Sequence, residues 1–233
     1  MAARKLDPSL VRDFDIFRQM SDDDLDAALA TASARRLPEG TVVFSQGAMA
    51  EEFFILLHGR LKVVQTTADG QQVVVRHVNP GEVYGIAMAV GRDDYPATAT
   101  AVAESLTLAW PNREWNSLIA RSPALSLSML QTVGQRLQDA HTRIRELSTE
   151  AVERRVAHAL LRLVRQAGKR TEEGILIDFP ITRQDIAEMT GTTLHTVSRI
   201  LTAWEGQGLV AGGRKKIVVC DAHRLFLLAE AAD

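Results

Sequence analysis

The chain has 233 residues, of which 46% are hydrophobic, so it is long enough for two modest domains with separate cores. Its formal net charge of −2 argues against a general basic coat for nucleic acid. Cys220 is the single cysteine, which excludes an intramolecular disulfide and a four-cysteine iron–sulfur cluster within one chain. Because the sequence shows no signal peptide and no apolar run of about 18 residues, we expect a soluble, cytoplasmic protein without a membrane partner.

The N-terminal part predicts one helix followed by short strands. Ser21 precedes three aspartates, as is typical of a helix N-terminus. Short β segments separated by turns follow, at 41–44, 52–57, 61–65, 72–77 and within 98–110. Regularly spaced short strands with glycine turns indicate a β-barrel or jelly roll, which can enclose a small ligand.

A long helix is predicted from Pro123 to about Leu147. Its apolar residues recur at spacings of three, four, three, four and three, which is the seam of a coiled coil. These residues are Leu130, Val133, Leu137, Ala140, Ile144 and Leu147. We expect this seam to form a dimer interface; the alternative is a single helix packed on its own domain. Residues 148–151 interrupt the seam and are the predicted hinge.

Beyond the hinge, an amphipathic helix at 152–166 and a polar loop at 170–174 lead into a helix-turn-helix pattern at 181–208. Thr182 with Asp185 has the spacing of a capping box, and Gly191 separates the two helices. In the second helix, which ends at Gly206, one apolar stripe is predicted to face the core. It contains Leu194, Val197, Ile200, Leu201 and Trp204.

The opposite face of this second helix carries His195, Ser198, Arg199 and Thr202. A helix that buries one side and offers a cation, a hydroxyl and an imidazole on the other suits a DNA major groove. Downstream, Arg214, Lys215 and Lys216 interrupt two apolar segments, which predicts a hairpin with a basic tip. This is the wing of a winged helix-turn-helix. The sequence therefore predicts an α+β protein that binds double-stranded DNA, with affinity that weakens in salt.

Three motifs in this order resemble the CRP/FNR family of bacterial transcription regulators, and the resemblance extends over essentially the whole chain. They are FFILLHGRLKVV at 53–64, PGEVYG at 80–85 and RQDIAEMTGTTLHTVSRIL at 183–201. The resemblance implies a cyclic-nucleotide-binding-like β-roll at 1–121, a dimerisation helix and hinge at 122–150, and a winged helix-turn-helix at 151–233. It also implies a homodimer that reads an inverted repeat, works with RNA polymerase and is not an enzyme.

The resemblance further implies which residues contact DNA. The base-reading positions fall on His195, Ser198 and Arg199, with Arg199 contacting a guanine. The predicted DNA-binding set is Arg183, Thr193, His195, Thr196, Ser198, Arg199, Arg214, Lys215 and Lys216. Ser198 with Arg199 looks like the FNR branch, which reads TTG-type half-sites, so we expect a TTGAT-like inverted repeat. His195 looks like the nitric-oxide-responsive, denitrification-type regulators known as NnrR or Dnr.

The pocket departs from the cyclic-nucleotide members of the family. Ile86 stands where those proteins have the glutamate that holds the ribose, and residues 95–97 contain no phosphate-binding arginine. Ala140 and His141 replace the threonine–serine pair that reaches the adenine. Because burying a phosphate without its arginine carries a large desolvation cost, we do not expect cyclic AMP as the effector.

Two effector classes fit the remaining residues. The first is haem with a diatomic gas, for which His141 or His58 is the candidate iron ligand. The second is a small organic ligand, such as an aromatic acid. The predicted pocket residues are His58, Tyr84, Ile86, Trp110, Arg136, Ala140 and His141. A barrel that works without any ligand is a third alternative.

Two rival functions come from other classes. An enzyme is disfavoured because the sequence shows no paired-histidine metal spacing, no nucleophile–base arrangement and no phosphate-binding glycine loop. We therefore assign no catalytic residue and no further metal ligand. A dimeric adaptor that binds protein instead of DNA is the other rival, and a gel shift distinguishes it.

Overall fold

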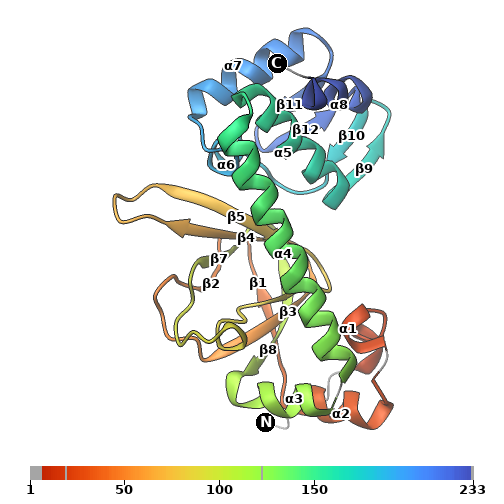
Figure 1. The fold of residues 1–233 in the computed structure, drawn as a ribbon. Coiled ribbons are helices and arrows are strands. Elements are labelled where there is room, and N and C mark those ends of the chain that lie inside the picture. Colours follow the sequence, from red (N-terminus) through yellow and green to blue (C-terminus); the bar gives the residue numbers. More distant parts are fainter. Residues whose placement is uncertain (1–6, 19, 122, 232–233) are drawn as a thin grey trace. The chain divides into compact units, whose positions relative to one another are not determined.

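The computed structural model describes residues 7–18, 20–121 and 123–231, and Figure 1 labels its helices and strands. Residues 1–66 with 75–138 form one compact unit, and residues 67–74 with 139–233 form a second. The long helix α4 (Pro123–Thr149) therefore belongs partly to each unit. Within the described ranges, no helix is long and apolar enough to cross a membrane.

The first unit begins with short helices and continues as strands. Ser21 caps α2 by accepting a hydrogen bond from the amide of Asp24 at 3.2 Å, which confirms the predicted helix start. The helical elements are η1 (Pro8–Leu10), α1 (Asp15–Arg18), α2 (Asp22–Ala30), η2 (Met88–Val90), η3 (Asn112–Glu114) and α3 (Trp115–Arg121). The strands are β1 (Ser33–Leu37), β2 (Val42–Phe44), β3 (Glu52–His58), β4 (Leu61–Thr66), β5 (Gln72–Val78), β6 (Val83–Tyr84), β7 (Thr98–Ala101) and β8 (Ser105–Pro111).

These strands form two four-stranded sheets, in the orders β1-β8-β3-β6 and β2-β7-β4-β5. We call the two sheets together the β-roll; the predicted jelly-roll architecture is confirmed (Figure 1). Strand β1 was not predicted, because four of its five residues are exposed and their sequence shows no alternation of apolar and polar residues.

The two faces of β3 separate two hydrophobic cores. Phe53 and Ile55 pack with the N-terminal helices, whereas Phe54 and Leu56 point into the β-roll. This division follows from the two-residue period of a strand, because successive side chains point to opposite faces. A strand buried on both faces reads as a continuous apolar run, as 53–57 does.

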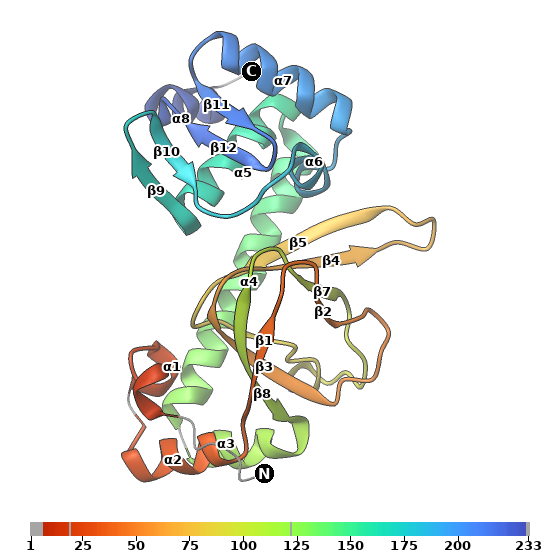
Figure 2. The ribbon, with the colours of Figure 1, turned by 180° about the vertical axis from the view of Figure 1, so that it is seen from behind.

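The second unit contains α5 (Val152–Ala167), α6 (Arg183–Thr190), α7 (Leu194–Gly206) and α8 (Ala222–Glu230). Its sheet has the order β11-β12-β10-β9, seen in Figure 2. The strands are β9 (Gly168–Thr171), β10 (Gly174–Ile177), β11 (Val210–Gly213) and β12 (Lys216–Val219). The prediction of a polar loop at 170–174 was wrong, because β9 and β10 pair there as an antiparallel hairpin. All four residues of β9 are exposed, so hydrophobic pattern gives no strand signal there.

Ion pairs cross the short connection between α4 and α5, where the hinge was predicted. Helix α4 ends at Thr149 and α5 begins at Val152. Glu146 is buried and accepts from Arg162 at 2.5 Å, and the side chains of His158 and Glu150 lie 3.4 Å apart. The end of α4 is thus tied to α5 within the second unit, and a hinge at 148–151 stays a prediction.

Candidate nucleic-acid interface

The helix-turn-helix begins with the predicted capping box. The hydroxyl of Thr182 accepts from the amide of Asp185 at 3.0 Å, and the Asp185 carboxylate accepts from the amide of Thr182 at 2.8 Å. Helix α6 ends at Gly191, whose φ of 61° lies in the left-handed region that glycine adopts without strain. These local signals fix both ends of α6.

Helix α7 presents one buried and one exposed face. Thr193 caps it by accepting from the amide of Thr196 at 3.2 Å. The buried face consists of Val197, Ile200, Leu201 and Trp204. The indole N–H of Trp204 donates to Glu153 of α5 at 2.9 Å, so the helix is oriented by a specific bond as well as by packing.

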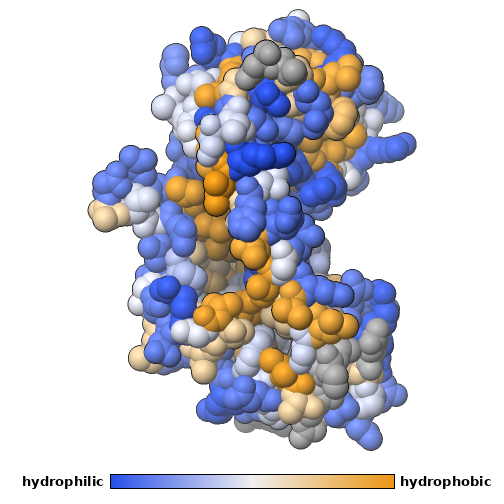
Figure 3. Space-filling view, in the orientation of Figure 1, coloured by the Kyte–Doolittle hydropathy of each residue, from blue (hydrophilic) through white to orange (hydrophobic). Residues whose placement is uncertain are grey.

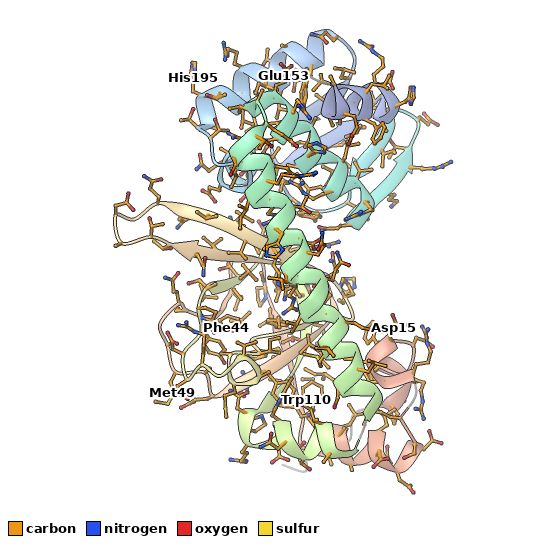
Figure 4. All side chains as sticks on the ribbon, viewed as in Figure 1. Asp15, Phe44, Met49, Trp110, Glu153 and His195 are labelled. Atoms are coloured by element: carbon orange, nitrogen blue, oxygen red, sulfur yellow. The ribbon has the colours of Figure 1, made fainter. Side chains whose placement is uncertain are left out.

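The outer face of α7 matches the predicted reading face. His195 and Arg199 are exposed, and Thr196 and Ser198 are half-buried. Figure 4 shows His195 pointing outward from the first turn of the helix. The buried face fixes the rotation of α7, so these polar groups stay on one side and are free to meet the edges of base pairs.

Leu194 departs from the expectation that it belongs to the buried stripe. Its side chain is 47% exposed, although Val197 and Leu201 on the same spacing are buried. Leu194 is the first residue of α7, and helical side chains lean toward the N-terminus. In the first turn, that direction takes a side chain past the end of the helix and away from the core.

Arg183 was predicted to contact DNA, but here its guanidinium is engaged by α7. It donates to the Glu205 carboxylate at 2.9 Å and to the Thr202 hydroxyl at 3.3 Å. These bonds join the first residue of α6 to the second half of α7. In this structure, Arg183 positions α7, and its contact with DNA stays a prediction.

The wing forms as predicted from the basic tip. Gly213 pairs with Lys216 at the end of the β11–β12 ladder, and Arg214 with Lys215 makes the turn. Lys215 has a φ of 60°, a backbone angle that residues other than glycine adopt mainly in tight turns. All three cations of the tip are exposed, so the wing adds positive charge to the surface of the second unit.

In the first unit, the interior of the β-roll is filled by aromatic rings. Phe44 stacks on Tyr95 with ring centroids 3.9 Å apart, and Phe54 stacks on Tyr84 at 5.0 Å. The Tyr84 hydroxyl donates to Thr107 at 2.8 Å, and burial raises the pKa of Tyr84 well above its usual value. Tyr84 is therefore a packed core residue whose polar atom already has a partner.

The prediction that Tyr84 and Trp110 line one pocket was wrong. The two residues lie on strands that flank β3, and Phe54 pairs with Tyr84 whereas Phe53 pairs with Trp110. They consequently face opposite sides of the sheet. Trp110 packs against the N-terminal helices, where its indole N–H donates to the Ala28 carbonyl at 2.8 Å; Figure 4 shows it well away from Phe44 of the roll interior.

Arg136 of α4 lies beside the β-roll together with Arg76 of β5. Arg136 donates to the carbonyl of Val83 at 2.7 Å, and Arg76 pairs with Glu82 at 2.5 Å. Burial, together with the nearby positive charge of Arg76, lowers the pKa of Arg136 to about 10. Two guanidinium groups thus meet one carboxylate, which leaves an excess of positive charge in a partly buried place. Sequence reasoning missed Arg76, although a lone cation inside the apolar run of β5 was a visible signal.

The remaining pocket candidates do not converge in one unit. His58 is exposed at the end of β3, and Ile86 is buried with the N-terminal helices. Ala140 and His141 are exposed on the part of α4 that belongs to the second unit. Within the part of the chain that the structure describes, no group of three or more histidine, cysteine or acidic residues is arranged to hold a metal ion.

The predicted dimer seam is uncovered in the single chain. The five large residues of the seam are between 39% and 69% exposed. Figure 3 shows apolar side chains following α4 on the face toward the viewer. Leaving a row of leucine, valine and isoleucine in water is costly, so this face calls for a partner surface.

Two family models match the chain. A cyclic nucleotide-binding domain matches residues 34–122, and a Crp-like helix-turn-helix domain matches residues 154–227. The chain is 29% identical to the cyclic AMP receptor protein of Thermus thermophilus over 92% of this chain and 96% of that protein. It is 30% identical to the global nitrogen regulator of Synechocystis over 76% of this chain and 80% of that protein. The fold is also that of FixK2 from Bradyrhizobium japonicum, with a TM-score of 0.74, 21% identity, and coverage of 87% of this chain and 99% of that one.

Proposed function

This chain belongs to the CRP/FNR family of transcription regulators, whose members bind DNA and act as dimers, and on that premise we propose its specific target and control. It is a homodimer that reads a TTGAT-type inverted repeat and responds to a small effector held beside the β-roll. The observation that carries the DNA proposal is the outer face of α7, where His195, Ser198 and Arg199 stand on a helix whose opposite face is buried.

Dimerisation explains the exposed seam of α4 and the expected symmetry of the operator. Two copies related by a two-fold axis present two α7 helices, and such readers take half-sites about 34 Å apart, one turn of DNA. The direct test is a gel shift on a TTGAT–N4–ATCAA duplex against a scrambled duplex of equal composition. Selective retardation of the first supports the proposal, and equal retardation of both overturns the operator assignment.

RNA polymerase is the proposed partner on the operator, because relatives of the chain are named as a transcriptional regulator and a transcriptional activator. The rival adaptor function predicts no sequence-selective DNA binding in the same gel shift. Whether the protein raises or lowers transcription is then read from in vitro transcription of a template that carries the operator.

For the effector, the geometry favours a small organic anion. Burial lowers the pKa of Arg136, which donates a hydrogen bond to the carbonyl of Val83. The carboxylate of Glu82 beside it already pairs with Arg76. An incoming carboxylate would neutralise this excess charge and bond bidentately to a guanidinium. The names of the relatives refer to cyclic AMP and to nitrogen, so family membership alone does not identify the effector of this chain.

A thermal-shift screen of small carboxylic acids, including aromatic acids, tests this assignment. A specific binder raises the melting temperature by mass action, and Arg136→Gln should abolish that shift. Arg113→Gln is the matched control, because Arg113 is an exposed arginine of η3 in the same unit. If no acid stabilises the protein, or if both variants respond equally, the anion site is wrong.

The second candidate effector is haem with nitric oxide, which rests on the resemblance of His195 to the NnrR/Dnr regulators. The candidate ligands fit haem poorly, because His58 and His141 are both exposed and haem iron is ordinarily ligated within a protein pocket. Titration of haem into anaerobic protein, followed by the Soret band, decides this question. A saturable band at one haem per subunit that His141→Ala or His58→Ala removes would replace the organic anion with haem.

Cyclic AMP and an iron–sulfur cluster stay outside the proposal. Residues 95–97 place a tyrosine ring, a proline and an alanine where a phosphate would need a cation, and Tyr95 and Ala97 are buried. The single cysteine cannot supply four thiolate ligands. If the screens find no ligand at all, regulation by abundance alone is the remaining reading.

We propose that control works by population shift. An effector must bind two arrangements of the protein with unequal affinity to change operator affinity. Arg136 lies on the same helix as the dimer seam, so a ligand there acts on the element that joins the two copies. Operator affinity that is unchanged at saturating effector would contradict this mechanism.

A further inference from the structure

The indole of Trp204 connects helix α7 to a residue outside the helix-turn-helix. Trp204 is 0% exposed, and a buried indole N–H needs a hydrogen-bond partner. That partner is the carboxylate of Glu153, which accepts from the indole at 2.9 Å and lies beside α7 (Figure 4). Glu153 is itself exposed, so core packing does not account for its position. Because the acceptor is charged, this hydrogen bond is stronger than a neutral one.

Glu153 is the second residue of α5, directly after the connection between α4 and α5. The helix dipole favours an acidic residue in the first turn of a helix, and that alone would explain a glutamate here. It does not explain why the side chain is bonded to α7. The bond joins α7 to the helix that follows the connection, whereas Arg183 joins α7 to α6 within the helix-turn-helix.

The other side of the connection contacts the chain at the start of α7. Leu147 lies in the last turn of α4, and a Cβ atom placed on Gly191 would lie 2.9 Å from the Cδ2 atom of Leu147. Leu147 therefore packs directly on the turn that precedes α7. The contact at Gly191 holds the beginning of α7, and the bond to Trp204 holds its second half. Contacts near both ends of a helix fix its position and its rotation.

The rotation of α7 decides what its outer face presents. His195 and Arg199 lie on the side of the helix away from Trp204, so a rotation about the helix axis moves both of them. Binding groups have to be held within about 0.5 Å of their productive geometry. A residue that holds the buried side of α7 can therefore control reading without contacting DNA.

We propose that Glu153 is a positioning residue for DNA reading, which holds α7 in place relative to the α4–α5 connection through the indole of Trp204. The proposal rests on the proposed function, because it needs α7 to read the operator. It gives the connection a defined route to the reading face. A change in the direction of α5 moves Glu153, and the hydrogen bond passes that movement to α7.

The experiment compares Glu153→Ala with Glu153→Gln. Both variants lose the negative charge, but the glutamine keeps an oxygen that can accept from the indole. Glu172→Ala is the charge control, because Glu172 is an exposed glutamate in the turn between β9 and β10. Dissociation constants are measured by fluorescence anisotropy on the tightest duplex selected from random-sequence DNA and on a scrambled duplex. The ratio of the two constants, which we call the selectivity, cancels any uniform effect of charge.

We expect Glu153→Ala to lower the selectivity about tenfold, the factor that corresponds to one lost hydrogen bond. Glu153→Gln and Glu172→Ala should keep the selectivity of the unaltered protein. The melting temperature of Glu153→Ala should change little, because water can replace an exposed carboxylate. In a Trp204→Phe background, which lacks the donor, Glu153→Ala should have no further effect.

Equal selectivity of the Glu153→Ala and Glu153→Gln variants would overturn the proposal and leave DNA reading intact. Loss of selectivity together with a large fall in melting temperature would also overturn it, since Glu153 would then serve only to hold the fold. Failure of the unaltered protein to select any sequence would instead overturn the proposed function, and the role of Glu153 with it.

Discussion

Arg199 stands on the outer face of α7, where its guanidinium is exposed to solvent. Bidentate bonding to the two acceptors of a guanine contributes about 1–3 kcal/mol of discrimination. Arg199→Ala should therefore lose about 1–3 kcal/mol of binding free energy on the operator with guanine at that position of TTGAT, and it should accept other bases there. Arg199→Lys is the control that keeps the charge and loses the bidentate geometry. Binding measured on operators with each base at that position checks this, and an unchanged preference in Arg199→Ala would remove Arg199 from the reading face.

Tyr84 gives a residue-scale prediction about pH. Burial raises the pKa of Tyr84 in the folded state, so the unfolded chain releases the proton first as the pH passes about 10. The free energy of unfolding should then fall with rising pH above that value, by up to ~1.4 kcal/mol per pH unit. Tyr84→Phe should flatten this decline relative to the unaltered protein. Urea unfolding at pH 8 and pH 11 measures it, and equal declines in both proteins would contradict the buried hydroxyl.

At the scale of elements, the seam of α4 predicts the oligomeric state. Leu137 is 57% exposed in the single chain, so Leu137→Glu should leave the folded chain intact and place a charge in the dimer interface. We expect sedimentation of a monomer and loss of operator binding, because one half-site supplies only part of the contacts. Gln138→Glu adds the same charge at the next, exposed position and should stay dimeric. A dimeric Leu137→Glu would place the interface elsewhere.

The ion pair between α4 and α5 gives a prediction about the free energy of unfolding of the second unit. Glu146→Gln leaves the guanidinium of Arg162 without its buried carboxylate and should cost about 3 kcal/mol of unfolding free energy. Replacing both residues by leucine should recover most of that loss, because the unpaired charge is gone. Glu230→Gln, on the exposed end of α8, serves as the control in denaturant unfolding. If Glu146→Gln costs no more than the control, the ion pair does not hold the connection.

The sequence predicted those elements whose side chains follow a period and whose ends carry a chemical signal. The capping box at Thr182, the glycine at 191 and the apolar faces of β3 and α7 were all visible. Strand β9 was missed because its side chains are exposed and only backbone pairing holds it. The helical period predicted Leu194 in the core. The apolar period extends to the first residue of α7, but the core does not reach that far along the helix. The prediction of one pocket with Tyr84 and Trp110 was wrong because side chains alternate between the two faces of a sheet, and these two residues lie in different hydrophobic cores.

For the whole molecule, a net charge of −2 has to be reconciled with binding to a polyanion. Affinity then comes from cations placed at the contact surface. Each phosphate that such a cation neutralises contributes about 0.9 to the slope of log affinity against log salt concentration. Arg214→Gln with Lys216→Gln should lower that slope by about 3.6 for a dimer and weaken cognate and scrambled DNA alike. Lys169→Gln with Arg170→Gln removes the same charge from the exposed β9 and should leave the slope unchanged. Equal effects of the two double variants would mean that overall charge, and not the wing, governs the affinity.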